Sequence, residues 1–291
     1  MKYRHSFHAG NFADVHKHVA LLALLRALKR KDKGFLYLDT HAGRGSYDLS
    51  GGSAEAAAGV GRFLQAQPVA AELRDYAELL SAFRARAGGQ QLHPGSPLVA
   101  ASELRAQDRA VLVEVRGADA HALEQSLAAL TMRRGHDLNA RVERGDGFAR
   151  LRAFLPPRER RGLTLVDPPY EEEEDFNRVS TVLIEAARRF PTGVVALWYP
   201  IKDERTIAPW HADCVRALQA VTESPPTLLA SELWLYPRDS RVALNGSGLL
   251  IMNPPWLTHE RMQVWLPELQ RCLAVGPGGG SSVRTLSDSP R

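Results

Sequence analysis

The chain has 291 residues, 44% of them hydrophobic, which is enough for one large domain or for one domain with an insertion. The net charge of +4 and the pI of about 9.2 fit an anionic partner such as nucleic acid but do not require one. The two cysteines, Cys214 and Cys272, lie far apart, which excludes a disulfide framework and a cysteine-based zinc site and suits a reducing cytoplasm. The sequence has neither an apolar run long enough to cross a bilayer nor a signal-peptide core.

The first part of the chain predicts a helix, a strand and a helical insertion. Apolar residues recur at helical spacing over residues 15–28. A strand at 35–39 then runs into the glycine-containing loop 40–45, where the backbone can approach a ligand closely. Residues 51–91 are alanine-rich and helical, and we interpret them as a small insertion. Residues 93–97 form a rigid proline-containing loop before another helix.

Strands and helices alternate through the rest of the chain. Strands are expected at 110–114, 140–143, 162–166 and 193–199, with helices between them. The last two strands, 228–236 and 248–253, are too close for a parallel crossover and predict an antiparallel hairpin. The pattern indicates an α/β fold with a mostly parallel seven-stranded sheet and an antiparallel edge strand. We expect 1–50 and 92–274 to form the main domain, 51–91 the insertion and 275–291 a disordered tail.

Residues 162–170 deliver a carboxylate to the edge of this sheet. The buried strand 162–166 must stop where Pro168 and Pro169 follow, because proline cannot donate to a sheet ladder. Asp167 therefore lies at the carboxyl edge, where open α/β folds place their ligands. The Asp167 carboxylate, the Pro168 carbonyl and the Tyr170 ring together could grip a planar base that carries an exocyclic amine.

Four successive strand ends carry acids, namely Asp39, Glu114, Asp146 and Asp167. A carboxylate at the end of the second strand can hold both hydroxyls of a ribose, and an acceptor at the end of the third can meet an adenine amine. Each acid alone is weak evidence, because loops at strand ends are often acidic for solvation reasons, but four on one edge suit a cationic ligand such as a sulfonium. The Gly43-Arg44-Gly45 loop is not the dinucleotide fingerprint, because the third glycine is absent.

These motifs resemble the class I S-adenosylmethionine-dependent methyltransferases, with their Rossmann-like fold, that modify amino nitrogens of bases. The similarity extends to the RlmJ family, which methylates N6 of an adenine in 23S ribosomal RNA. It is carried by residues 3–11, 38–43, 94–97 and 196–200, and it runs from Tyr3 to about Trp256. The Asp-Pro-Pro-Tyr motif specifies only amino methylation, whereas the N-terminal block is specific to the family.

The resemblance implies S-adenosylmethionine as cofactor, 23S rRNA as partner and a cytoplasmic location. It also implies that residues 1–50 and 92–274 form the methyltransferase domain. Carried over by position, the implied cofactor contacts are His18, His41, Ser96, Glu114, Asp146, Gly147 and Asp167. The implied proton acceptor is Asp167. Tyr3 is the implied RNA contact, and His5 and Lys17 are expected near the substrate. We expect no metal, no membrane contact, no obligate protein partner and a monomer.

The chemistry of an adenine amine assigns the remaining roles. Asp167 and Pro168 would each accept one N6 hydrogen, so that the nitrogen lone pair points at the methyl group and transfer depends mainly on positioning. Tyr170 would stack on a base taken out of its helix. We expect residues 3–11 to close over the pocket as a lid.

Several alternatives stay open. A DNA adenine-N6 methyltransferase is the nearest, although the chain has no large target-recognition region. The missing third glycine and the unexplained Asp167 motif weigh against a nicotinamide-dependent dehydrogenase. The intact set of strand-end acids weighs against a non-catalytic RNA-binding protein. A second tetrad, Asn253-Pro254-Pro255-Trp256, should lie at the opposite edge, because its strand is antiparallel. His16 and His18 lie about 200° apart on a helix and cannot share a metal ion. Trp198 is either a wall of the base pocket or part of a core strand.

Overall fold

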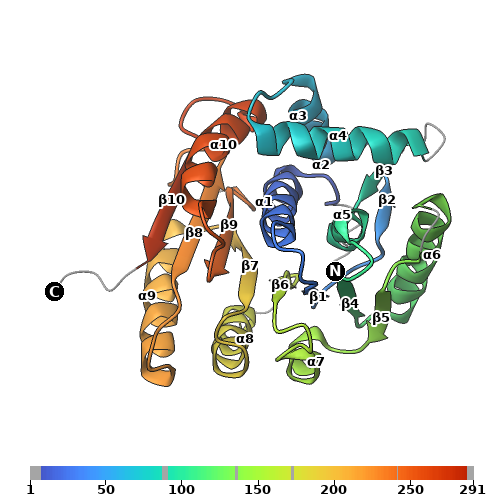
Figure 1. Cartoon of the computed structure of the whole chain (residues 1–291). Coiled ribbons are helices and arrows are strands. Elements are labelled where there is room, and N and C mark those ends of the chain that lie inside the picture. The colour runs from blue at the N-terminus through green and yellow to red at the C-terminus, as the bar shows by residue number, and fades with distance from the viewer. Residues whose placement is uncertain (1–7, 87–90, 135–136, 172–173, 241, 287–291) are drawn as a thin grey trace.

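A central sheet with helices on both faces forms the molecule (Figure 1). The computed structural model describes residues 8–86, 91–134, 137–171, 174–240 and 242–286. The main sheet has eight strands in the order β10-β8-β9-β7-β6-β1-β4-β5. The strand bounds are β1 Leu36–Asp39, β4 Arg109–Glu114, β5 Ala140–Arg144, β6 Gly162–Val166, β7 Val194–Ile201, β8 Leu228–Trp234, β9 Gly246–Met252 and β10 Gly280–Leu286.

Strands β5, β4, β1, β6 and β7 are parallel to one another, as predicted. The central strands consist mostly of apolar residues because helices bury both faces of the sheet. Every residue of β6 is buried. Strand β9 runs antiparallel to both β7 and β8, which confirms the predicted hairpin. Strand β9 nevertheless lies inside the sheet, between β7 and β8, and not at its edge.

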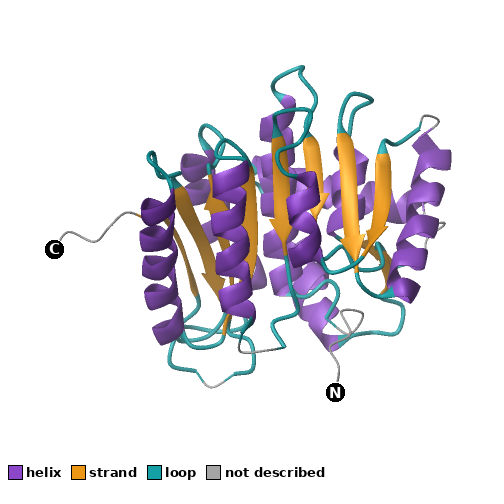
Figure 2. Ribbon diagram, turned by 90° about the horizontal axis from the view of Figure 1, so that it is seen from below, coloured by secondary structure: helices purple, strands orange, loops and turns teal. Residues whose placement is uncertain are grey.

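Two layers of helices cover the sheet (Figure 2). One core cluster joins the sheet to α1, α5, α6, α10 and the insertion, and the other joins it to α7, α8 and α9. The bounds are α1 Phe12–Lys29, α5 Ser96–Glu103, α6 Gly117–Arg134, α7 Gly147–Phe154, α8 Asp175–Arg189, α9 Glu204–Val221 and α10 Thr258–Leu273. No helix in the described part of the chain is both long and apolar enough to span a membrane.

Within the expected 51–91 insertion, residues 54–65 and 71–86 are helical and pack against α1 and α10 (Figure 1). The insertion contains α2 Ala54–Ala56, the π-helix Ala57–Gly61, α3 Arg62–Gln65 and α4 Ala71–Arg86. The segments on either side of it pair as a small antiparallel sheet of β2, Ser46–Asp48, and β3, Leu92–Pro94. Part of the expected proline loop 93–97 is therefore strand, because β2 offers it a partner.

The C-terminal segment corrects two predictions. We expected 275–291 to be disordered and the sheet to have seven strands, but Gly280–Leu286 forms an eighth strand, β10. Strand β10 pairs antiparallel with β8 along its whole length and packs Val283 against the core. The glycine- and serine-rich composition indicated flexibility, whereas the free edge of β8 supplies the hydrogen-bond partners that order the segment.

Candidate active site

The four strand-end acids meet at one edge of the sheet, as predicted. Asp39 ends β1 and Glu114 ends β4. Asp146 and Asp167 come just after β5 and β6. Because these four strands are adjacent and parallel, their carboxyl ends share one edge, the one at which open α/β folds bind ligands.

A cavity of about 130 Å³ opens between these strand ends, α1 and the start of α5. Most of the predicted site residues line it: Lys17, His18, His41, Ser96, Glu114, Asp167 and Pro168. The lining also includes polar residues that sequence reasoning missed, namely Tyr47, Arg116 and Asp119. Arg116 and Asp119 closely follow the strand end at Glu114 and could have been inferred, whereas Tyr47 depends on the unpredicted strand β2.

Two backbone N–H groups hold Glu114 in place. Gly43 N donates to Oε2 at 2.8 Å, and Arg116 N donates to Oε1 at 2.7 Å. Burial raises the pKa of Glu114, and these hydrogen bonds partly offset the shift. Gly43 has a φ of +63°, and a Cβ there would lie 2.5 Å from the Tyr47 hydroxyl oxygen, so the turn requires glycine. A fixed carboxylate beside bare backbone is the arrangement that binds ribose hydroxyls.

Asp39 is fully buried and does not line the cavity, which corrects the expectation that all four acids face the ligand. Its Oδ2 accepts hydrogen bonds from the hydroxyls of Tyr37 and Ser96, at 2.8 and 2.7 Å. Its Oδ1 accepts one from His41 N at 3.2 Å. Burial raises the pKa of Asp39 to about 6. Asp39 therefore positions Ser96 and His41, which do line the cavity.

Lys17 joins Asp167 to a second buried acid, Asp14. The Lys17 Nζ atom lies 2.5 Å from Asp167 Oδ2 and 2.8 Å from Asp14 Oδ1, and the Lys17 and Asp14 side chains are each 4% exposed. Burial alone would lower the pKa of Lys17, but the two carboxylates raise it well above its usual value, so the amine is charged. Sequence reasoning missed Asp14, although its i,i+3 spacing from Lys17 on α1 is a signal of an ion pair.

Tyr170 does not present its ring to the cavity, which corrects the prediction that it stacks on a base. The residue is 7% exposed, and its ring packs against Phe176 and Trp198 with centroids 5.0 and 5.6 Å away. Its hydroxyl donates to the Trp198 carbonyl at 2.5 Å. Tyr170 thus anchors the loop that carries Asp167. Trp198 is half-buried, and its ring centroid lies 5.9 Å from Lys17 Nζ, so it borders the same region.

Asp146 and Gly147 lie at the start of α7 and do not line the cavity. Asp146 Oδ1 caps the helix by accepting from Phe148 N at 2.9 Å, and its Oδ2 lies 2.9 Å from an Arg178 nitrogen. A Cβ at Gly147 would lie 1.8 Å from the Thr40 carbonyl oxygen, so only glycine lets α7 pack against the loop after β1. Arg178, from α8, had no signal in the sequence.

The remaining predicted residues are placed as follows. Tyr3 and His5 lie outside the described residues. Asn253 lies beyond the end of β9 at the opposite edge of the sheet, as predicted, and its Nδ2 donates to backbone carbonyls. His16 contacts Ser231 and Ser247, whereas His18 contacts Tyr76, so these two histidines face different partners.

Strand β9 is inserted antiparallel between β7 and β8, and the Asp-Pro-Pro-Tyr motif lies on the ligand-binding edge. Together these two features define a Rossmann-like class I methyltransferase. The fold agrees with the class predicted from sequence. The chain belongs to the family described as ribosomal RNA large subunit methyltransferase D, RlmJ, whose model matches residues 32–286.

Individual relatives match along nearly the whole chain. Ribosomal RNA large subunit methyltransferase J of Escherichia coli is 39% identical, over 97% of this chain and 98% of its own. The protein of the same name from Haemophilus influenzae is 37% identical, over 97% of this chain and 96% of its own. A Legionella pneumophila protein of known crystal structure is 31% identical, with a TM-score of 0.80 over 96% of this chain and 98% of its own.

Proposed function

We propose that the chain transfers a methyl group from S-adenosylmethionine to N6 of an adenine in 23S rRNA, in the cytoplasm, and that Asp167 and Pro168 receive the amine. The observation that carries the proposal is that both residues line the same cavity as His41 and Glu114. Groups that can accept hydrogen bonds from an amine and a carboxylate that can bind ribose hydroxyls therefore share one site. The relatives named ribosomal RNA large subunit methyltransferase J support the choice of a large-subunit ribosomal RNA as substrate.

The cavity chemistry fits the cofactor. S-adenosylmethionine supplies an electrophilic methyl group on a positively charged sulfur. Glu114 would hold its ribose hydroxyls, and Asp119 and Asp167 add negative charge to the same lining. Burial lowers the pKa of His41 to about 4, so its ring is neutral at pH 7 and does not repel a cation. The cavity is smaller than most ligand sites of 300–1,000 Å³, so the proposal includes a widening of the site when the cofactor binds.

Lys17 prepares Asp167 for the amine. Its ion pair with Asp167 fixes the orientation of the carboxylate, and Asp14 holds the ammonium on its other side. An adenine amine would bring one N–H to Asp167 and one to the Pro168 carbonyl, which directs the nitrogen lone pair at the methyl carbon. The proton leaves only after methylation, when the nitrogen is acidic, and Asp167 is placed to accept it.

A parallel methylation assay tests the proposal. Unmodified 23S rRNA, 16S rRNA and adenine-containing duplex DNA are incubated with the protein and cofactor labelled in its methyl group. We expect label only in 23S rRNA, recovered as N6-methyladenosine after digestion. Label mainly in duplex DNA would instead assign the DNA adenine methyltransferase alternative, and label in no nucleic acid would refute the proposal.

A further inference from the structure

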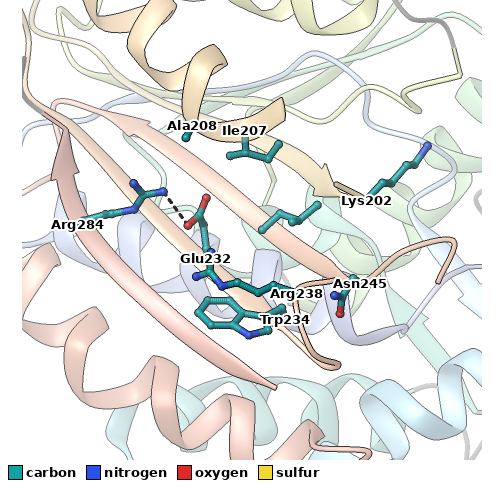
Figure 3. A pocket seen from close by; sticks show the side chains of 9 residues that line it. Lys202, Ile207, Ala208, Glu232, Trp234, Arg238, Asn245 and Arg284 are labelled. Carbon is teal, nitrogen blue, oxygen red and sulfur yellow. Dashed lines mark hydrogen bonds and ion pairs between the residues drawn. The ribbon is translucent and has the colours of Figure 1, made fainter. Parts of the chain in front are cut away.

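A second pocket, of about 300 Å³, lies on the outer strands of the sheet (Figure 3). It is lined by side chains from β7–β10 and from the first turns of α9, and the argument uses Glu232, Trp234, Arg238 and Arg284. None of these belongs to the Asp167 cavity. The volume reaches the range of sites that hold a nucleotide-sized ligand.

The one acid in this pocket is already neutralised. Glu232 is 3% exposed, and its Oε2 lies 3.0 Å from an Arg284 nitrogen, an ion pair drawn in Figure 3. Its Oε1 accepts a hydrogen bond from the Tyr199 hydroxyl at 3.0 Å. Arg238 and Lys202 also line the pocket, so its lining carries more positive than negative charge. An anion that entered would meet an excess of cations.

Arg238 and Trp234 form a stacked pair at the mouth of the pocket. The guanidinium carbon of Arg238 lies 3.9 Å from the centre of the Trp234 ring, and Figure 3 shows the arginine crossing that ring. Trp234 is half-buried and Arg238 is exposed. Burial and the nearby charge of Arg284 both lower the pKa of Arg238, so an anion beside these two arginines would relieve their repulsion. Planar guanidinium groups bind phosphate through paired N–H bonds, and a base can stack on the outer face of a guanidinium that itself lies on an aromatic ring.

The two pockets lie along the same edge of the sheet. Asp167 follows β6, and Lys202 and Trp234 stand at the carboxyl ends of β7 and β8, which extend about three residues, or roughly 10 Å, past the level of Asp167. Strands β6 and β8 are three strand spacings apart, roughly 14 Å at the usual spacing. At a stacked rise of about 3.4 Å per nucleotide, a single strand crosses the resulting span in about five nucleotides.

We propose that this pocket binds a phosphate and an adjoining base of the substrate RNA, a few nucleotides from the adenosine in the Asp167 cavity. This inference depends on the proposed function, because it takes the RNA to be the occupant. A strand whose target base is withdrawn into one cavity needs its flanking nucleotides held nearby. A basic pocket on the same edge, with an arginine laid flat on an aromatic ring, can bind such a nucleotide by its phosphate and its base.

The variants Arg238→Glu and Trp234→Ala test the inference, with Arg205→Glu as the matched control. Arg205 lies in the first turn of α9, the helix end that borders the pocket, and its side chain is 89% exposed. It pairs with Asp203 and does not line the pocket. For unmodified 23S rRNA, we expect Arg238→Glu to raise the filter-binding Kd and the KM about tenfold, with kcat at saturating RNA within about twofold of wild type. The magnitude of the slope of log Kd against log salt should decrease by the amount expected for the loss of about one phosphate contact. Arg238→Lys should recover part of the affinity, and Arg205→Glu should change it less than about twofold.

The outcomes separate this inference from the proposed function. If wild type methylates 23S rRNA and Arg238→Glu and Trp234→Ala behave like Arg205→Glu, the second pocket does not bind RNA and the inference is overturned alone. The inference is also overturned if Arg238→Glu leaves RNA binding intact and weakens calorimetric binding of AMP instead, since the pocket is then a small-molecule site. If wild type methylates no RNA, the proposed function fails, whatever the variants do.

Discussion

The Asp167 cavity and the Trp234 pocket share one edge of the sheet but carry opposite charge. Acids outnumber bases in the lining of the first, which holds Glu114, Asp119 and Asp167 against Lys17 and Arg116, whereas three basic side chains and one neutralised acid line the second. The net charge of +4 for the whole chain conceals this division. A cationic cofactor and an anionic polymer can thus be served by neighbouring parts of one edge, because each strand end contributes its own residues.

The two regions also differ in how deeply their charges are buried. In the Asp167 cavity, Lys17 is 4% exposed and Asp167 is 13% exposed, whereas Arg284 in the second pocket is 45% exposed. A buried charge that loses its partner is costly, while a solvated one is not. Substitutions of Lys17 or Asp167 should therefore affect chemistry and stability, whereas substitution of the exposed Arg238 should affect mainly the affinity for RNA.

The largest expected effect is that of Asp167→Asn. Asparagine keeps the size of the side chain but replaces one acceptor oxygen by a donor, so the amine loses a partner and the proton its acceptor. We expect kcat to fall by about 10³-fold or more, with cofactor binding by calorimetry retained. Asn253→Ala, at the opposite edge, is the control and should keep near-normal turnover. Comparable rates for the two variants would remove Asp167 from the mechanism.

Next in size is the effect of Lys17→Met on stability. The substitution leaves Asp14 and Asp167 buried near each other without the cation between them. We expect the free energy of unfolding in urea to fall by about 3 kcal/mol. Arg238→Glu, in the solvated pocket, should change it by less than about 0.5 kcal/mol. Equal losses of unfolding free energy in the two variants would contradict the expectation that the buried charges contribute more to stability than the solvated ones.

The smallest effect concerns His16, which precedes Lys17 on α1 but faces the other way, towards Ser231 of β8 and Ser247 of β9. Burial lowers the pKa of His16 to about 3. Below pH 6.5 the unfolded chain binds a proton that the folded chain does not, so stability declines as the pH falls towards 3. His16→Gln should remove up to about 1.4 kcal/mol per pH unit of that decline, or about 2 kcal/mol by pH 5.

Urea unfolding at pH 7, 6 and 5 measures this slope. His121→Gln is the control, because His121 is 63% exposed. It should leave the pH dependence of stability unchanged. A slope that is the same in His16→Gln as in wild type would show that His16 exchanges its proton freely in the folded chain.

Local sequence determined the parallel part of the fold. The apolar strand 162–166 and its proline stop placed Asp167 at the ligand edge, and the short connection between β8 and β9 required a hairpin. These features depend on residues close together in the chain, where proline geometry and loop length leave few choices.

Contacts between distant residues were decided only by the tertiary structure. The sequence could not show that Lys17 and Asp14 would meet Asp167, that Tyr170 would turn into the core, or that Asp39 would be buried under Ser96. It also could not show that 280–286 would add a strand or that Arg238 would stack on Trp234 beside Arg284. Composition describes the preference of each segment alone, whereas hydrogen-bond partners, burial and charge pairs exist only once the packed sheet brings those segments together.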